Sequence, residues 1–256
     1  MIVTKKFIFI HVPKTGGTFV REKLKLISRR YPDFFVEELI ELKHSGVSKI
    51  PPQYSNLPIL SCIRDPKSHL ISRFNFQWWV RNADKRFNVE LSKAKYPNFP
   101  NLDIEDFYDL ICDPVFRNSN KVKKTQLLAS EKSIGFNTLI YLNKFFPKLL
   151  NLLKIDNDEI IHEEIFNCFS KINFLNTNNL SEDLYLFLNK LNFLKNDILE
   201  EIKKSTKILP KMDPRIKNHN VNPKQKYTIN NLPLSLEQKI KTRERFINRF
   251  INRSCV

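Results

Sequence analysis

The sequence predicts an α/β fold, with a central and mostly parallel sheet flanked by helices. Two short apolar runs, at 7–12 and 57–63, have strand length and lack the polar alternation of a half-exposed strand. Each run is followed by apolar residues at helical spacing. A chain of 256 residues, 41% of them hydrophobic, can bury a sizeable core, so we expect a single domain over residues 1–256.

The first predicted unit is a strand, a tight loop and a helix. The strand covers FIFI at 7–10 and continues to Val12. The helix follows a pair of glycines, and its apolar face is carried by Val20, Leu24 and Ile27. The next segment, FFVEELIEL at 34–42, fits a helix or a strand equally well.

A second strand and helix are predicted after the turn marked by Pro51 and Pro52. The strand covers LPILSCI at 57–63. Asp65 then suits the N-cap position of a helix, and Pro66 suits its first turn. The apolar face of this helix continues through Ile71, Phe74 and Trp78.

The remainder of the chain is predicted from its periodicity and its polar stretches. Helices are expected at 104–112, at 136–153, from 181 to 202 and at 235–252. The segments 88–103 and 209–233 carry prolines and asparagines and predict surface loops. DEIIHEEIF, at 158–166, predicts a short strand that runs into a turn and a helix.

The charge of the chain favours anionic partners. The formal net charge is +16, which attracts nucleic acid, anionic lipid, nucleotides or anionic glycans without choosing among them. A balance that only favours solubility explains the charge equally well. The 4 cysteines form no CxxC pair and are expected as buried thiols of a reducing compartment. The sequence shows neither a signal peptide nor an apolar run that could cross a bilayer, so we expect a cytoplasmic protein without an integral membrane segment.

Gly16 and Gly17 stand together in a chain that has only 4 glycines. A strand, a glycine loop and a helix N-terminus form an anion site, because the first helical N–H groups lack partners and the helix dipole is positive there. Lys14 adds a full charge, and Thr15 and Thr18 add hydroxyl groups. The order of lysine before glycine differs from the Walker loop GxxxxGK[ST]. The alternative is a turn that merely needs a positive φ.

A second cationic group follows the second strand. Arg64 lies at the strand end, where open α/β sheets bind their ligands, and Ser72 lies about two helical turns further on. A guanidinium can grip a phosphate with two hydrogen bonds, and the serine can donate a third. The alternative is that Asp65 caps the helix and Arg64 forms a salt bridge.

HVPKTGGT followed by IRDPxxxxxS resembles the two donor-binding motifs of carbohydrate-type sulfotransferases. The resemblance is closest to the group that includes heparan sulfate 2-O-sulfotransferases and their bacterial relatives. It is strong over residues 7–20 and 60–76, and moderate at 43–50, where a KH element lies between the two motifs as in bacterial members, whose pattern resembles KHxxxxEI. It is faint at 158–166, which resembles a later strand-and-acid segment, and at 217–227, which resembles a loop on the cofactor side.

The resemblance implies a P-loop-type three-layer fold and the donor 3′-phosphoadenosine 5′-phosphosulfate (PAPS). It places the 5′-phosphosulfate among Lys14, Thr15, Gly16, Gly17 and Thr18. It places the 3′-phosphate on Arg64 and Ser72. Lys217 and Lys224 would belong to the late loop.

Two departures from the family pattern stand in the second motif. His69 replaces an arginine that is frequent in the family, and Phe74 and Phe76 stand where a tyrosine is frequent. Both changes would alter donor affinity.

The expected reaction is an in-line sulfuryl transfer that depends on positioning and electrostatics. Lys14 would stabilise the leaving phosphate. A histidine, with its ordinary pKa of about 6.5, suits the general base. His44 corresponds to the catalytic histidine of related enzymes; the other histidines are His11, expected in the core, His69, expected on the cofactor side or the surface, and His162 and His219. No carboxylate cluster suggests a metal.

Two further interpretations stay open. One is a nucleotide kinase of the same broad fold; the other is a non-enzymatic module that binds nucleic acid or an acidic glycan. Acids such as Glu37, Glu38 and Glu41 interrupt a continuous nucleic-acid face, so no nucleic acid is expected as partner. Trp78 and Trp79 could line an acceptor cleft, although the helical face favours a core position for Trp78. A glycan hydroxyl is the expected acceptor by resemblance.

Overall fold

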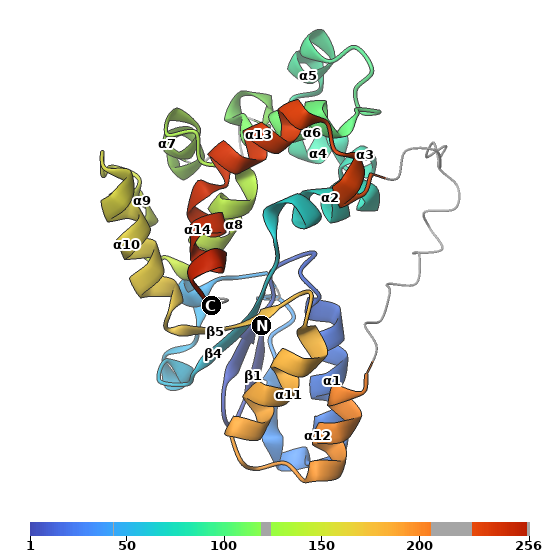
Figure 1. Ribbon diagram of the computed structural model, residues 1–256, viewed down its shortest axis with the longest axis vertical. Helices are drawn as coiled ribbons and strands as arrows, with labels where there is room; N and C mark the ends of the chain where they lie inside the picture. The colour runs from blue at the N-terminus through green and yellow to red at the C-terminus, as the bar shows by residue number, and fades with distance from the viewer. Residues whose placement is uncertain (43, 119–123, 206–226, 255–256) are drawn as a thin grey trace. The chain divides into compact units, whose positions relative to one another are not determined.

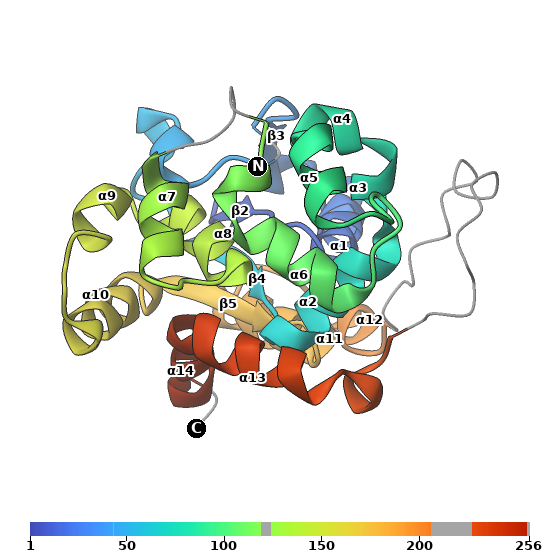
Figure 2. The same cartoon turned by 90° about the horizontal axis from the view of Figure 1, so that it is seen from above.

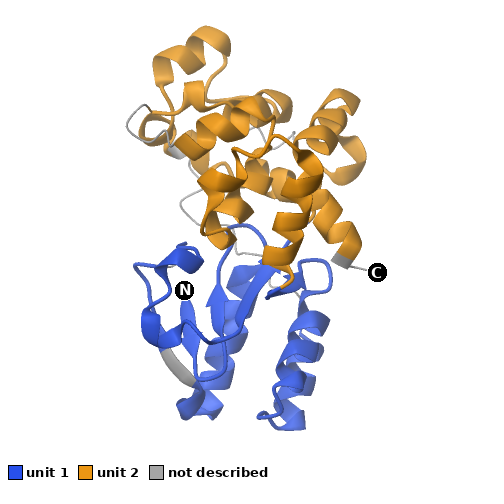
Figure 3. Ribbon diagram, turned by 90° about the vertical axis from the view of Figure 1, so that its left-hand side faces the viewer, with its two compact units in different colours: residues 1–64, 171–226 blue, residues 65–170, 227–256 orange. Residues whose placement is uncertain are grey.

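The computed structural model describes residues 1–42, 44–118, 124–205 and 227–254. The chain divides into two compact units, residues 1–64 with 171–226 and residues 65–170 with 227–256 (Figure 3). Each unit is described by itself. The single domain expected from the sequence stays a prediction.

Unit 1 is built on a five-stranded sheet in the order β3-β1-β2-β4-β5. β2, β4 and β5 run parallel, and β1 pairs antiparallel with both β2 and β3. The strand bounds are β1 Ile2–Thr4, β2 Ile8–Ile10, β3 Phe35–Glu38, β4 Ile59–Ile63 and β5 Ile172–Asn176. The α/β class is confirmed, and the sheet is mixed because β1 runs antiparallel to both of its neighbours.

The helices of unit 1 are α1 Gly17–Arg30, α11 Leu180–Lys190 and α12 Asn196–Lys203 (Figure 1). One face of the sheet packs against them through a buried core in which Phe9 and Leu60 meet Val20, Leu24 and Leu184. The helical face expected for α1 is therefore confirmed. The long helix expected from 181 to 202 is two helices instead, because the chain turns at 191–195 and Asn192 has a positive φ of 50°.

Unit 2 is helical among its described residues. Its helices are α2 Pro66–Phe76, α3 Trp78–Arg81, α4 Ala83–Arg86, α5 Val89–Lys95, α6 Ile104–Cys112, α7 Lys124–Glu131, α8 Phe136–Phe145, α9 Leu149–Leu152, α10 Asp158–Phe169, α13 Leu234–Arg243 and α14 Arg245–Ser254. Figure 2 shows α13 beside α2, and α14 beside α10. Asp65 caps α2 by accepting a hydrogen bond of 3.0 Å from the Ser68 N–H, as the sequence predicted.

Four segment predictions in this unit were wrong. The single helix expected at 136–153 is two helices, α8 and α9, separated by residues 146–148. The expected loop at 88–103 contains α5, because Asn88 caps a helix by accepting from the Leu91 N–H. The expected strand at 158–166 is the helix α10, which Asn157 caps, and the strand follows it as β5. The final helix is broken at Glu244, whose carboxylate is buried.

The two tryptophans differ in how deeply they are buried. Gln77 adopts φ 49°, a left-handed conformation that ends α2 after Phe76. The turn at Gln77 rotates the residues after it relative to α2, which shifts the apolar face by one residue. Trp79 is therefore buried, and Trp78 is half-buried beneath the Arg86 guanidinium. Trp78 still packs against the core, so the core position predicted for it is only partly correct.

Candidate functional site

The loop between β2 and α1 has the conformation of a tight strand-to-helix turn. Lys14 has φ 69° and Gly16 has φ 89°, so two residues of this short loop are left-handed. Gly16 is the N-cap of α1. The backbone N–H groups of Gly17 and Thr18 stand in the first turn of α1. These donors and the positive end of the helix dipole suit an anion.

The two glycines are required for different reasons. Gly16 has a positive φ, and a methyl group in its place would also lie 2.6 Å from Leu180 Cδ2. Gly17 has an ordinary φ, but a methyl group there would overlap the His11 imidazole. The glycine pair thus provides a left-handed turn and room for a histidine ring.

Arg64, at the end of β4, contacts the same loop. Its Nη1 donates a hydrogen bond of 2.9 Å to the Lys14 carbonyl. Thr177, just beyond β5, is buried, and its hydroxyl lies 2.9 Å from the Thr15 carbonyl and 2.8 Å from the Ile63 carbonyl. The carboxyl ends of β2, β4 and β5 therefore meet at this loop, as parallel strands require. Sequence reasoning missed Thr177, since the strand before it was not predicted.

The two threonines of the loop differ in what they can offer a ligand. The Thr15 side chain is fully buried, and its hydroxyl donates to the Val12 carbonyl at 2.8 Å. Thr15 would therefore serve a ligand through its backbone N–H rather than its hydroxyl. Thr18 is exposed on the first turn of α1.

Ser72 and His69 lie on α2, in unit 2. Ser72 is half-buried, and its shared grip with Arg64 on a 3′-phosphate stays a prediction. His69 is completely buried, and its Nε2 accepts a hydrogen bond of 3.2 Å from Arg73 Nε. A surface position for His69 was therefore wrong, because the inner face of α2 carries it into the core, and a position on the cofactor side stays a prediction.

His11 and His44 are the histidines next to the loop in unit 1. Their ring centroids are 5.3 Å apart, and the rings are tilted by 52°. His44 is exposed, whereas His11 is half-buried and stacks on Phe9 at 6.2 Å. The core position expected for His11 is thus only partly correct. The His11 ring contacts His44 and also lies at the β-carbon position of Gly17, in the first turn of α1.

The remaining histidine and lysine candidates do not join this site. His162 lies on α10 in unit 2, where it packs on Phe246 at 4.6 Å, and burial lowers its pKa. His219, Lys217 and Lys224 lie outside the described residues.

Unit 2 also contains buried cations that sequence reasoning did not single out. The guanidinium groups of Arg73 and Arg117 each lie 5.2 Å from the Phe136 ring centroid. Burial lowers the pKa of both arginines to about 10, and it lowers the pKa of Lys144 to about 8. Only the helical period of Arg73 with Leu70 and Phe74 could have signalled such burial.

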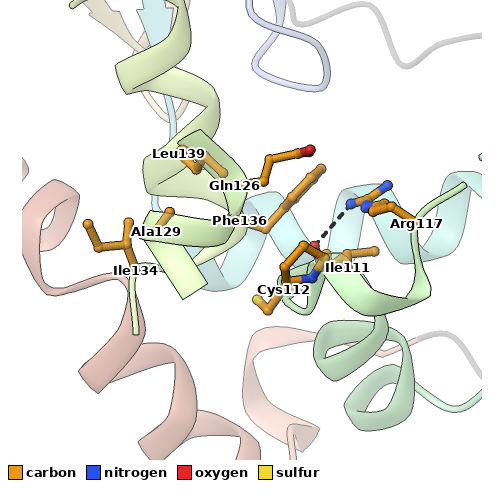
Figure 4. A pocket seen from close by; sticks show the side chains of 9 residues that line it. Ile111, Cys112, Arg117, Gln126, Ala129, Ile134, Phe136 and Leu139 are labelled. Carbon is orange, nitrogen blue, oxygen red and sulfur yellow. Dashed lines mark hydrogen bonds between the residues drawn. The ribbon is translucent and has the colours of Figure 1, made fainter. Parts of the chain in front are cut away.

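Figure 4 shows a small pocket in unit 2 that Phe136, Arg117 and Cys112 line together with apolar residues. Its free volume of about 10 Å³ holds no more than one water molecule. Arg117 donates a hydrogen bond of 3.0 Å to the Ile111 carbonyl beside it. The pocket is therefore a packing defect rather than a substrate site.

Neither a metal cluster nor a membrane-spanning helix is found in the part of the chain that the structure describes. No three histidine, cysteine or carboxylate side chains gather there as metal ligands do. None of its helices combines the length and apolarity that crossing a bilayer demands.

Comparisons with family models, with curated proteins and with solved structures found no match. The functional interpretation therefore depends on the geometry of the loop and on the sequence motifs.

Proposed function

We propose that the protein is a sulfotransferase that moves a sulfuryl group from PAPS to an acceptor hydroxyl, with a carbohydrate as the favoured acceptor. One observation carries the proposal: Arg64, from the second motif, donates its hydrogen bond to the Lys14 carbonyl of the first motif. The two motifs were predicted to share one ligand, and this contact supports that. The proposal includes a P-loop-type three-layer fold, to which the parallel strands β2, β4 and β5 belong.

The two ends of the donor would be bound by different kinds of groups, backbone N–H groups at one end and a guanidinium at the other. Backbone N–H groups of residues 15–18 would bind the 5′-phosphosulfate at the start of α1, where the dipole favours negative charge. Lys14 would supply the full positive charge. The Arg64 guanidinium would bind the 3′-phosphate, and the part expected for Ser72 stays a prediction.

In the proposed reaction, the acceptor oxygen attacks the sulfur while the bond between sulfur and the bridging oxygen breaks. The electrons of that bond pass to the 5′-phosphate, so adenosine 3′,5′-bisphosphate leaves with an additional negative charge. Lys14 and the N–H groups of α1 would stabilise this charge. The acceptor proton passes to His44, which lies one ring from the loop.

Thermal unfolding with nucleotides tests the donor site. Adenosine 3′,5′-bisphosphate should raise the melting temperature of the wild type, because it binds the folded state only. Lys14→Ala should remove most of this rise. Lys6→Ala, at an exposed position of the β1–β2 turn, is the matched control and should retain it. A rise with ATP and none with adenosine 3′,5′-bisphosphate would favour a kinase instead.

Turnover tests the base. We expect His44→Ala to lower the release of adenosine 3′,5′-bisphosphate from PAPS by about 10²–10⁴-fold, which is the contribution of a positioned base. Nucleotide binding should survive in this variant. Full turnover by His44→Ala would exclude His44 as the base.

A further inference from the structure

The absence of a side chain at Gly17 is explained by a neighbour within the protein. The β-carbon position of Gly17 is occupied by the His11 imidazole, whose Cδ2 and Nε2 atoms lie nearest to it. The ring therefore rests directly on the first turn of α1. It is supported from β2 by Phe9, with which it stacks at an interplanar angle of 18°.

The same ring contacts His44. The centroid distance of 5.3 Å places the two imidazoles in van der Waals contact range. His44 follows β3 in a turn, and its side chain is exposed. Contact with the His11 ring limits the positions that the His44 ring can take on this side.

We propose that His11 is a positioning residue: its ring, seated in the space that Gly17 leaves, holds the His44 imidazole toward the N-terminus of α1. The proposal rests on the proposed function, because His44 needs a fixed position only if it serves as the base. Catalysis is sensitive to such positions, and a displacement of about 1 Å can cost about 10²-fold in rate.

The proposed role of His11 depends on the volume of its ring and not on hydrogen bonds made by its nitrogen atoms. His11→Ala should therefore lower kcat for release of adenosine 3′,5′-bisphosphate from PAPS by about 10²-fold. The measurement uses the full chain, with a panel of neutral and acidic oligosaccharides as acceptors. The affinity for adenosine 3′,5′-bisphosphate should stay unchanged, since His11 provides none of the phosphate donors. His11→Phe keeps a ring in the same space and should restore most of the turnover.

His162→Ala is the matched control, because it removes a buried histidine that lies elsewhere in the fold. Any fall in turnover through general destabilisation would appear in this variant as well. Loss of turnover in both His11→Ala and His11→Phe would overturn the positioning role, and so would full turnover in His11→Ala. If the wild type released no adenosine 3′,5′-bisphosphate and bound none, the proposed function itself would fail.

A thermodynamic cycle tests the contact without any activity. Gly17→Ala should destabilise the fold, because the new methyl group displaces the His11 ring. The double variant Gly17→Ala with His11→Ala should lose less stability than the sum of the two single variants, since the overlap no longer exists. Additive losses would show that the His11 ring does not occupy this space.

Discussion

Glu244 is a completely buried carboxylate between α13 and α14. It accepts hydrogen bonds from the Asn137 N–H at 3.1 Å, the Thr138 N–H at 2.7 Å and the Thr138 hydroxyl at 2.7 Å. The Tyr108 hydroxyl, at 3.3 Å, donates a fourth. Glu244 therefore caps α8, whose own N-cap is a glycine without a side chain to offer.

Removing this carboxylate should be strongly destabilising. Glu244→Ala leaves several buried donors unpaired, and each costs about 1–3 kcal/mol, so we expect the free energy of unfolding to fall by about 3 kcal/mol or more. Urea denaturation measures the change. Glu131→Ala, at an exposed position at the end of α7, is the control and should change stability by less than about 0.5 kcal/mol. Equal effects in both variants would contradict the capping role.

The pH dependence of stability gives a second test of Glu244. Burial raises its pKa above the ordinary 4.5, while the hydrogen bonds from Thr138 and Asn137 lower it by less. A raised pKa means that the folded state binds more protons, so the contribution of Glu244 is fully present below about pH 4.5 and is lost as the pH rises. The stability advantage of the wild type over Glu244→Gln should shrink as the pH rises above about 4.5. An advantage that grows with pH would show that the hydrogen bonds outweigh burial.

The sequence predicts which residues form the loop, but it does not predict what each of them contacts. The spacing of Lys14, Gly16 and Gly17 after an apolar strand suffices to predict a strand-to-helix turn. It does not reveal that Gly17 makes room for His11, or that Thr15 uses its hydroxyl on Val12, because both depend on contacts made in three dimensions.

At the scale of elements, α10 and α14 are joined by a ladder of ion pairs and by aromatic packing. Arg245, Arg249 and Arg253 contact Asp158, Glu159 and Glu163 at 2.7, 2.6 and 2.9 Å. Phe250 packs edge-on against Phe169, with the ring centroids 5.2 Å apart. Since exposed ion pairs are screened by water and salt, the aromatic contact should dominate.

Two variants separate these contributions. Phe250→Ala should lower the free energy of unfolding by about 3–5 kcal/mol, because it leaves a cavity in the core. Arg249→Gln should produce little change, since both partners of its ion pair are exposed. Denaturation in low and high salt provides the measurement. A larger loss in Arg249→Gln than in Phe250→Ala would reverse this ranking.

Elements could be predicted where apolar periodicity and capping residues agreed. α6 matches its predicted bounds, 104–112, and Asp65 caps α2 as expected. Predictions failed where the conformation of a single residue decides which side chains enter the core. The left-handed φ of Gln77 is an example, because it places Trp79 rather than Trp78 deepest in the core. β5 was missed because its strand, INFLN, is short and has no regular alternation, with only Ile172 and Leu175 buried.

At the scale of the whole molecule, the net charge of +16 predicts polyanion binding that is independent of the loop. Retention on a heparin column should fall steeply with salt and should survive Lys14→Ala, since many lysines and arginines contribute. Binding of adenosine 3′,5′-bisphosphate should instead depend on Lys14. If Lys14→Ala left nucleotide binding intact, the chain would be better described as a general anion-binding module.

The central claim is that the ends of β2 and β4 hold one doubly phosphorylated nucleotide. A crystal structure with adenosine 3′,5′-bisphosphate tests it most directly. We expect the 5′-phosphate to lie against the backbone N–H groups of residues 15–18, and the 3′-phosphate to lie within hydrogen-bond distance of the Arg64 guanidinium. A nucleotide bound elsewhere, with the loop between Val12 and Gly17 vacant, would contradict it.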